Sequence, residues 1–316
     1  MDFISEYASS LTPSLTLAVT NKAKEMKARG EQVFGLAGGE PDKDTPENIK
    51  QAAIKALNEG ATKYTPSVGL PALREAIAAK LKKDNGLEYG IDQICVTSGA
   101  KPAVYAALRA VINPGHEVII PTPYWVSYPS MVQLCGGTPV LVETKPENGW
   151  KITAEEFENA MTPRTKLIIV NSPQNPTGAV YSEEELRAIG EIAVEEDILI
   201  LADEIYEHIS YCGQLTSIAS FPELKDRVVI INGVSKAYAM TGWRIGFCAA
   251  PAWIAKAVTK LQGQYSSGCS SIAQKAAEAA YVGSQECVEV MRQAFERRRD
   301  LIFGLVQQIP GFRLDK

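Results

Sequence analysis

From about residue 92 onward, the sequence alternates short β-branched runs with longer segments of helical periodicity. Each short run has the length of a strand, and each longer segment can return the chain across a sheet as a helix. The alternation predicts an α/β fold with a mainly parallel seven-stranded sheet sandwiched by helices. The expected strands are Ile94–Thr97, Glu117–Ile120, Pro139–Glu143, Leu167–Asn171, Leu199–Asp203, Val228–Asn232 and Ile245–Ala249.

Helix signals occur between these strands and before them. Ser182 and Glu185 have the spacing of a capping box, which predicts that a helix begins there. Residues 46–82 are expected to form two helices, because the proline and glycine of the loop 63–69 stop a continuous one. The first 45 residues are rich in loop signals and stand outside the alternation.

Three segments are therefore expected. Residues 1–45 would form an N-terminal arm and the first part of a small domain, and residues 46–285 the large domain. Residues 286–316 would begin the C-terminal part of the small domain.

Composition excludes several classes of protein. The 316 residues are 46% hydrophobic, and 32 Lys and Arg stand against 37 Asp and Glu, a net charge of −5. Such a chain has no broad basic field for nucleic acid or anionic lipid. Its six cysteines are far apart and form no C-x-x-C pair, so reduced thiols are expected rather than a metal site or a disulfide framework. With no signal-peptide pattern and no 18-residue apolar run, a cytoplasmic protein is expected.

Glycine and polar residues follow several expected strands, where ligands bind in open α/β sheets. Gly99, Ala100 and Lys101 follow the first strand and open a helix, whose free N–H groups and dipole suit a phosphate. A plain strand-to-helix turn fits the same residues. After the fourth strand, two X-Pro steps can hold Asn175 pointing inward, although a structural turn is the alternative. Asp203 ends the fifth strand after an apolar run, and a buried aspartate there needs a cationic partner.

A lysine, Lys236, follows the sixth strand, and Arg244 leads into the seventh. Apolar sequence surrounds Lys236, and desolvation would lower its pKa as a Schiff-base nucleophile requires, whereas a surface lysine in a turn is the alternative. A lysine, an aspartate, a phosphate-suited turn, an arginine and ring side chains are together the components of a pyridoxal 5′-phosphate site. Its aldehyde needs an amine, and its pyridinium nitrogen needs a carboxylate.

Several separate motifs support this interpretation in their order along the chain. They are residues 37–42 with Thr45-Pro46, residues 124–129, 171–178 and 203–206, and Ser235-Lys236 with residues 242–244. With these motifs the chain resembles, over essentially all its length, the fold-type I, class I aminotransferases of the subgroup with bacterial aspartate and aspartate/prephenate aminotransferases. The resemblance implies amino transfer from aspartate or glutamate to a 2-oxo acid, and a smaller α+β lobe beside the large domain.

Position by position, the resemblance also implies roles for individual residues. Lys236 would carry the cofactor and shuttle the proton, and Asp203 would pair with the pyridine nitrogen. Tyr206 and Asn175 would hydrogen-bond the phenolic oxygen, and Asn175 would also touch the substrate carboxylate. Trp125 would stack on the ring. The cofactor phosphate would be held by Gly99, Ala100, Lys101, Ser235 and Arg244.

Four positions bear on the substrate and on assembly. The resemblance implies that Gly39 shapes the substrate pocket, and that Tyr64 reaches the phosphate site of a neighbouring subunit, so that a homodimer shares its active sites. Thr16 and Lys101 match the pair that accompanies acceptance of prephenate beside aspartate. A lysine supplies a cation for a second carboxylate, although Lys101 could equally bind only the phosphate or lie on the surface.

One departure from the family leaves alternatives open. The family continues with an arginine that clamps the substrate α-carboxylate, whereas this sequence stops at Lys316, so a fragment with an incomplete small domain is expected. A truncated cofactor-binding module with little activity is one alternative. An elimination-type lyase is another, because such enzymes share the lysine, aspartate and tyrosine. A nicotinamide-dependent reductase is disfavoured, since no G-x-G-x-x-G follows the first strand.

Overall fold

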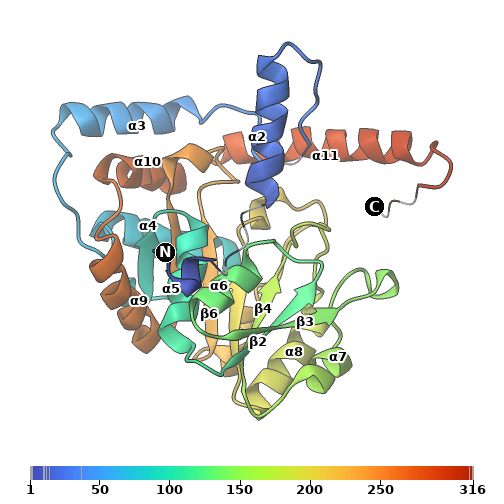
Figure 1. Cartoon of the computed structure of the whole chain (residues 1–316). Helices are drawn as coiled ribbons and strands as arrows, with labels where there is room; N and C mark the ends of the chain where they lie inside the picture. The colour runs from blue at the N-terminus through green and yellow to red at the C-terminus, as the bar shows by residue number, and fades with distance from the viewer. Residues whose placement is uncertain are drawn as a thin grey trace.

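The centre of the molecule is one seven-stranded sheet with the strand order β1-β7-β6-β5-β4-β2-β3. The computed structural model describes residues 3–9, 11, 13, 15–36, 38–312 and 314. Helices pack around this sheet, and α2 and α11 extend beyond these layers (Figure 1). The strands are β1 (Ile94–Thr97), β2 (Glu117–Thr122), β3 (Thr138–Glu143), β4 (Thr165–Asn171), β5 (Leu199–Asp203), β6 (Val228–Gly233) and β7 (Gly246–Ala249).

Most neighbouring strands run parallel. The pairs β2–β3, β2–β4, β4–β5 and β5–β6 are parallel, whereas β7 is antiparallel to both β6 and β1. Two antiparallel pairings restore the direction, so β1 points the same way as β6. The segments that follow β1, β4, β5 and β6 therefore meet at one edge of the sheet.

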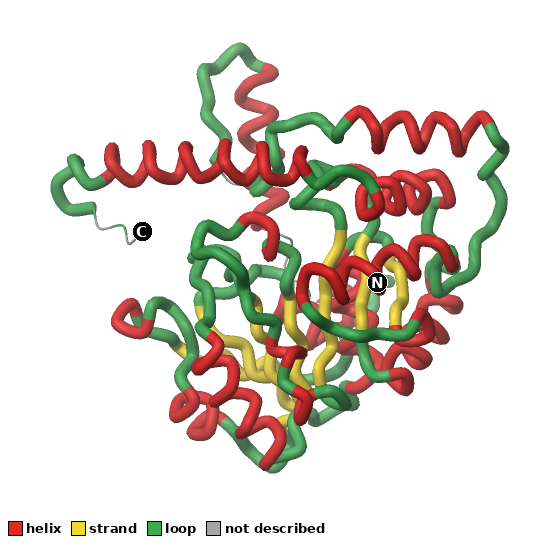
Figure 2. Tube along the Cα trace, turned by 180° about the vertical axis from the view of Figure 1, so that it is seen from behind, coloured by secondary structure: helices red, strands yellow, loops and turns green. Residues whose placement is uncertain are grey.

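Helices cover both faces of the sheet because successive side chains of a strand point to opposite faces. Ile168 and Ile200 belong to one core cluster, and Leu167 and Leu201 belong to the other. Viewed from behind, the strands lie between helices (Figure 2). The helices are α1 (Glu6–Ser9), α2 (Leu15–Ala28), α3 (Glu47–Asn58), α4 (Pro71–Asn85), α5 (Ala100–Val111), α6 (Tyr128–Leu134), α7 (Ala154–Ala160), α8 (Glu183–Glu195), α9 (Ala252–Tyr265), α10 (Ser271–Val282) and α11 (Glu286–Val306).

Local sequence signals explain several helix ends. Ser182 Oγ accepts from the N–H of Glu185 at 3.2 Å, and Glu185 Oε2 accepts from the N–H of Ser182 at 2.7 Å, so the expected capping box begins α8. The helix α4 ends at Asn85 and is capped by Gly86, whose φ of 69° lies in the left-handed region that glycine favours. The two helices expected within residues 46–82 are α3 and α4, separated by a loop.

The expected fold is therefore confirmed: a mainly parallel seven-stranded sheet sandwiched by helices. The six cysteines are free, and four of them are buried. Among the helices of the described residues, none combines the length and the apolar character needed to cross a membrane.

Candidate active site

The turn between β1 and α5 is built around Gly99. Its φ of 103° is a conformation that favours glycine,. A Cβ at this position would collide with the guanidinium of Arg244, and a Cβ at Gly246 would collide with the backbone N of Ala100. The first turn of α5 therefore lies close to Arg244 and to β7, with its N–H groups at the edge where the strands end.

Positive charge gathers at this turn. Arg244 donates from Nη2 to the carbonyl of Ser98 at 3.3 Å and from Nη1 to the carbonyl of Thr241 at 2.8 Å. Lys101 Nζ lies 4.9 Å from the centre of the Trp125 ring. Burial, together with the nearby charge of Arg244, lowers the pKa of Lys101. Two cations and a helix N-terminus thus converge, an arrangement that an anion such as a phosphate would stabilise.

At the end of β5, Asp203 is buried, with 3% of its surface exposed. Its Oδ2 accepts from the hydroxyl of Tyr128 at 2.7 Å, and its Oδ1 accepts from the N–H of Ile205 at 3.3 Å. Burial raises the pKa of Asp203 to about 6, against the opposing effect of these hydrogen bonds. Both hydrogen-bond donors are neutral. No cationic side chain of the described residues forms an ion pair with the Asp203 carboxylate, so these residues do not provide the cationic partner that the sequence predicted.

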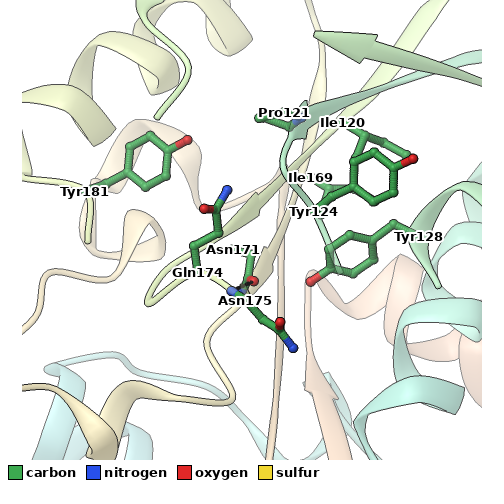
Figure 3. A pocket seen from close by; sticks show the side chains of 9 residues that line it. All are labelled: Ile120, Pro121, Tyr124, Tyr128, Ile169, Asn171, Gln174, Asn175 and Tyr181. Atoms are coloured by element: carbon green, nitrogen blue, oxygen red, sulfur yellow. Dashed lines mark hydrogen bonds between the residues drawn. The ribbon is translucent and has the colours of Figure 1, made fainter. Parts of the chain in front are cut away.

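Asparagine and tyrosine side chains line the adjacent loop. Asn175 donates from Nδ2 to the hydroxyl of Tyr206 at 3.2 Å, and its N–H donates to Asn171 Oδ1 at 2.8 Å. Asn171 in turn donates to the carbonyl of Asp203 at 2.8 Å. These bonds tie the ends of β4 and β5 together. Asn171, Asn175 and Tyr128 also line a cavity of about 10 Å³, about the space that one water molecule needs. Figure 3 shows this cavity from close by.

The side chain of Lys236 reaches the same edge from the loop after β6. Its Nζ donates to the carbonyl of Gly39 at 2.5 Å and lies 5.6 Å from the centre of the Tyr206 ring. Burial, helped by the charge of Arg244 and opposed by that of Glu40, lowers the pKa of Lys236. The preceding Ser235 is itself buried. The structure therefore brings an amine with a lowered pKa close to the tyrosine that follows β5.

Some residues of the expected site lie elsewhere in this chain. Tyr64 is fully exposed in the loop between α3 and α4. Thr16 lies in the first turn of α2, where its carbonyl accepts from Thr20 Oγ1 at 2.8 Å. Ala37, the first residue of the expected motif 37–42, lies outside the described residues.

Two residues of the site were not predicted from the sequence. Tyr128 belongs to one of the motifs but received no role, and its hydroxyl is a hydrogen-bond donor to Asp203. Its ring also packs edge-on against Trp125, with 5.2 Å between ring centres. Asn171 ends β4 and joins two loops of the site. Position at a strand end could have pointed to Asn171, whereas Tyr128 starts a helix and offers no such signal.

Comparisons with known proteins agree with this geometry. A family model described as "Aminotransferase class I and II" matches residues 31–314. An aspartate aminotransferase of Geobacillus stearothermophilus is 55% identical over 98% of this chain and 79% of its own length. A probable aspartate/prephenate aminotransferase of Rhizobium leguminosarum bv. phaseoli is 49% identical over 98% of this chain and 78% of that protein.

Solved structures give the same result. The crystal structure of an aspartate aminotransferase from Rhizobium meliloti matches with a TM-score of 0.94 and 43% identity, over 98% of this chain and 78% of that one. The Thermus thermophilus aspartate aminotransferase with maleate matches with a TM-score of 0.92 and 44% identity, over 95% of this chain and 79% of that one.

The fold is that of a pyridoxal-phosphate enzyme of fold type I. The chain belongs to the class I and II aminotransferases, and it is a pyridoxal-5′-phosphate-dependent enzyme that acts on an amino acid and a 2-oxo acid.

The residues present fit this cofactor. Asp203 is a buried carboxylate that forms no ion pair among the described residues, and a protonated ring nitrogen would supply its cationic partner. Lys101 lies in the first turn of α5 and Arg244 lies beside it, where a phosphate would balance their positive charges. Lys236 offers the amine that an aldehyde requires.

Proposed function

We propose that this enzyme transfers the amino group of a dicarboxylic amino acid, aspartate or glutamate, to a 2-oxo acid, with Lys236 as the residue that carries the cofactor. The observation that carries the proposal is the combination at one sheet edge of a lysine with a lowered pKa and a buried carboxylate that has no cationic partner among the described residues. These are the amine and the carboxylate that the cofactor requires.

Each group at this edge has a proposed part in the reaction. When bound, pyridoxal 5′-phosphate supplies an electron sink for the negative charge left when the substrate loses its Cα proton. Lys236 Nζ takes that proton and later returns it, a role that its lowered pKa favours,. Asp203 stays ionised against the ring nitrogen, and Tyr206 and Asn175 hydrogen-bond the phenolic oxygen. Trp125 stacks on the ring.

Further residues complete the proposed site. The backbone and side chains at the start of α5, with Ser235 and Arg244, hold the phosphate, and Gly39 borders the substrate. The contact of the Gly39 carbonyl with Lys236 Nζ supports this role. Gly99, Ala100 and Lys101 form the part of the phosphate site contributed by the start of α5.

A dicarboxylic substrate is supported by the charge of the site. Lys101 and Arg244 carry positive charge at the open edge, and the phosphate would not use every donor of both side chains. Relatives with about half their residues identical are named for aspartate. A solved relative with 44% identity carries maleate, a dicarboxylate.

Prephenate is a second proposed substrate. Thr16 and Lys101 are the pair that suggested it, and relatives with 49% identity are named aspartate/prephenate aminotransferases. We expect prephenate to act as an amino acceptor from aspartate, and replacement of Lys101 by alanine to weaken its use together with that of dicarboxylic acids.

Assembly and domain boundaries are also proposed. Tyr64 is fully exposed on a loop. Such exposure is expected of a residue that completes the phosphate site of a second copy, so we propose a homodimer with shared active sites. We propose that residues 1–45 form an N-terminal arm and the first part of a small domain, and that residues 46–285 form the large domain. Residues 286–316 begin the C-terminal part of the small domain. The extension of α2 and α11 beyond the sheet layers supports this division (Figure 1).

The test is the product analysis of purified protein loaded with cofactor. With aspartate and 2-oxoglutarate we expect oxaloacetate and glutamate in equal amounts, and none from the Lys236→Ala variant. Release of ammonia and pyruvate from one amino acid without any acceptor would contradict amino transfer and indicate elimination instead.

A further inference from the structure

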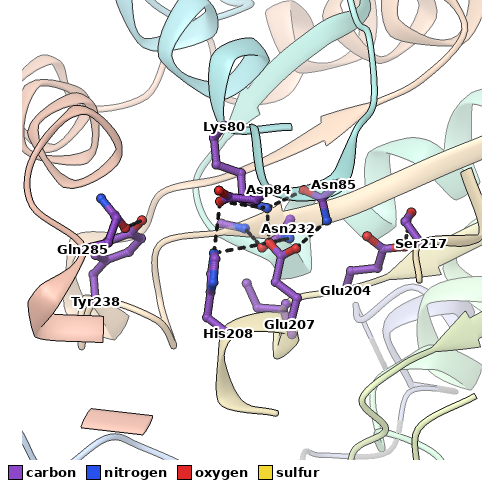
Figure 4. A network of polar contacts seen from close by, with 12 residues as sticks. Lys80, Asp84, Asn85, Glu204, Glu207, His208, Ser217, Asn232, Tyr238 and Gln285 are labelled. Carbon is purple, nitrogen blue, oxygen red and sulfur yellow. Dashed lines mark hydrogen bonds and ion pairs between the residues drawn. The ribbon is translucent and has the colours of Figure 1, made fainter. Parts of the chain in front are cut away.

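A buried ionic network includes Glu207, the residue that follows Tyr206 in the chain (Figure 4). Its carboxylate accepts hydrogen bonds from Lys80 Nζ, from Asn85 Nδ2 at 2.7 Å and from Asn232 Nδ2 at 2.6 Å. Only 8% of the Glu207 side chain and 5% of the Lys80 side chain are exposed. His208 Nε2 lies 3.6 Å from the same carboxylate. Solvent therefore contributes little to the balance of these charges.

The network joins three elements of the fold. Lys80 and Asn85 belong to α4, whereas Glu207 begins the short 3₁₀ helix η3 (Glu207–Ile209). Asn232 lies in β6, four residues before Lys236. The pairing of β5 with β6 ends at Asp203 and Ile231, so the bond from Asn232 to Glu207 links the two segments beyond the last paired residues.

The charge on Glu207 is maintained inside the protein. Burial acts to raise its pKa, but Lys80, His208 and the hydrogen bond from Asn85 hold the pKa of Glu207 below its ordinary value. A buried ion pair adds little net stability compared with apolar packing, because both charges lose their hydration. It does fix one geometry, since each oxygen has specific donors. The network is thus better explained by the position that it imposes than by stabilisation.

Two contacts of the candidate active site are made by Tyr206, the residue that precedes Glu207. The hydroxyl of Tyr206 accepts from Asn175 at 3.2 Å, and its ring lies 5.6 Å from Lys236 Nζ. We propose that Glu207 is a positioning residue, whose carboxylate holds the turn that carries Tyr206 against the strand end that leads to Lys236. The proposal rests on the proposed roles of Tyr206 and Lys236 in amino transfer.

The test measures the pKa of Lys236 in the whole chain freed of cofactor, from the pH dependence of its modification by trinitrobenzenesulfonate, read by peptide mass spectrometry. In Glu207→Gln the turn would loosen and Lys236 would be better hydrated, so its pKa is expected to rise by roughly one unit, a tenfold change in proton affinity. Loss of the negative charge alone would act in the opposite direction and lower this pKa.

Glu117→Gln is the matched control. Glu117 is also buried, and it pairs with Arg164 at 2.6 Å, but it lies at the amino end of β2, away from the edge where the site is formed. This variant is expected to leave the pKa of Lys236 unchanged. With cofactor bound, Glu207→Gln is expected to lower kcat by roughly tenfold to a hundredfold with KM within about threefold, as misplacement of a reacting group does.

A second variant keeps the proposal testable if Glu207→Gln does not fold. Asn232→Ala leaves the charges of Lys80 and Glu207 paired but removes the link to β6, so a smaller rise in the pKa of Lys236 is expected. An unchanged or lowered pKa in the folded variants would overturn the positioning role. Failure of the unaltered enzyme to transfer amino groups would instead refute the proposed function, because the pKa measurement uses neither cofactor nor substrate.

Discussion

The carboxyl group of Asp203 illustrates how one residue can prepare a site for a ligand. Its two hydrogen-bond donors, Tyr128 and the N–H of Ile205, are neutral. Burial therefore raises its pKa from 3.8 to about 6. Because the folded chain without cofactor binds this proton more tightly than the unfolded chain, ionisation of Asp203 destabilises the fold. The destabilisation is absent below pH 3.8 and fully present above about pH 6.

Replacement of Asp203 by asparagine should remove this pH dependence. In the chain without cofactor, the free energy of unfolding of Asp203→Asn, relative to the unaltered chain, is expected to rise by about 2 kcal/mol between pH 4 and pH 7.5, which is most of the effect of a pKa shift of about two units,. Urea unfolding at several pH values measures this difference. A difference that stays constant with pH would mean that the pKa of Asp203 is not raised in the folded chain.

Tyr128 has the opposite effect on the same carboxylate. Its hydrogen bond lowers the pKa of Asp203, so Tyr128→Phe should leave more of the carboxyl protonated and weaken its pairing with the cofactor ring. The cofactor dissociation constant is expected to rise roughly tenfold, the usual effect of a lost hydrogen bond to a charged group. Titration of the cofactor-free chain with pyridoxal 5′-phosphate, followed by absorbance, measures it.

The control for this variant is Tyr181→Phe. The Tyr181 hydroxyl is also buried and accepts from the N–H of Ile152 at 3.1 Å, but it makes no hydrogen bond to Asp203. Loss of the Tyr181 hydroxyl should reduce the stability of the fold and leave the affinity for cofactor within about twofold of that of the unaltered chain. Equal losses of affinity in both variants would argue against a specific role of Tyr128.

At the residue scale, the sequence predicted the groups that follow strands. Asp203 and Lys236 could be found because a polar group directly after a buried strand lies at a sheet edge. Tyr128 and Glu207 could not, because their partners come from other parts of the chain: 75 residues separate Tyr128 from Asp203, and 127 separate Lys80 from Glu207.

At the scale of elements, the strands followed from their apolar runs. The bounds expected for β1 and β5 agree with the structure, and β2 extends beyond the expected Ile120 to Thr122. The extension includes Pro121. A proline in the sequence predicts the end of a strand, but the residues of β2 stay paired with those of β3 through Thr122,. The reversed direction of β7 could not be read from its residues, since direction depends on where the chain returns to the sheet.

The turn before α5 gives a prediction for a whole element. Gly99→Ala would strain a backbone with a φ of 103° and displace the Arg244 guanidinium from the start of the helix. The dissociation constant for the cofactor is expected to rise by at least roughly a hundredfold, because charge-assisted contacts with the phosphate are lost together. Equilibrium dialysis against pyridoxal 5′-phosphate measures this constant.

Gly86→Ala separates strain from the loss of the phosphate contacts. Gly86 also has a positive φ, 69°, and a Cβ there would meet nothing within 4 Å. Both variants should lose stability by about 1 kcal/mol or more, but only Gly99→Ala should lose the cofactor. Tight binding of the cofactor by Gly99→Ala would contradict the phosphate site proposed at α5.

At the scale of the whole molecule, the candidate site combines segments that lie far apart in the chain. The carbonyl of Gly39 meets Lys236, and Thr45 Oγ1 donates to the carbonyl of Ala239 at 2.8 Å. Trp243 Nε1 donates to the same Thr45 hydroxyl at 3.0 Å. These contacts hold the segment after α2 against the loop after β6. Sequence periodicity predicts elements but not such contacts, because nothing local specifies them.

Shared active sites in a homodimer can be tested by complementation. The variants Tyr64→Ala and Lys236→Ala should each be weakly active or inactive alone. If subunits exchange after mixing, half of the dimers are hybrids, and each hybrid has one site with both residues intact. Activity is expected to recover to roughly a quarter of that of the unaltered enzyme. No recovery, with hybrids detected by native mass spectrometry, would contradict a role for Tyr64 in the neighbouring site.

The central claim is that Lys236 carries the cofactor, and reduction of the loaded protein with borohydride tests it most directly. Lys101 is the competing amine, because its pKa is also lowered and it lies beside the same turn. Peptide mass spectrometry after reduction is expected to find the phosphopyridoxyl group on Lys236, and reduction in the presence of excess aspartate should abolish this label. Label on Lys101 or another lysine, with none on Lys236, would contradict the account.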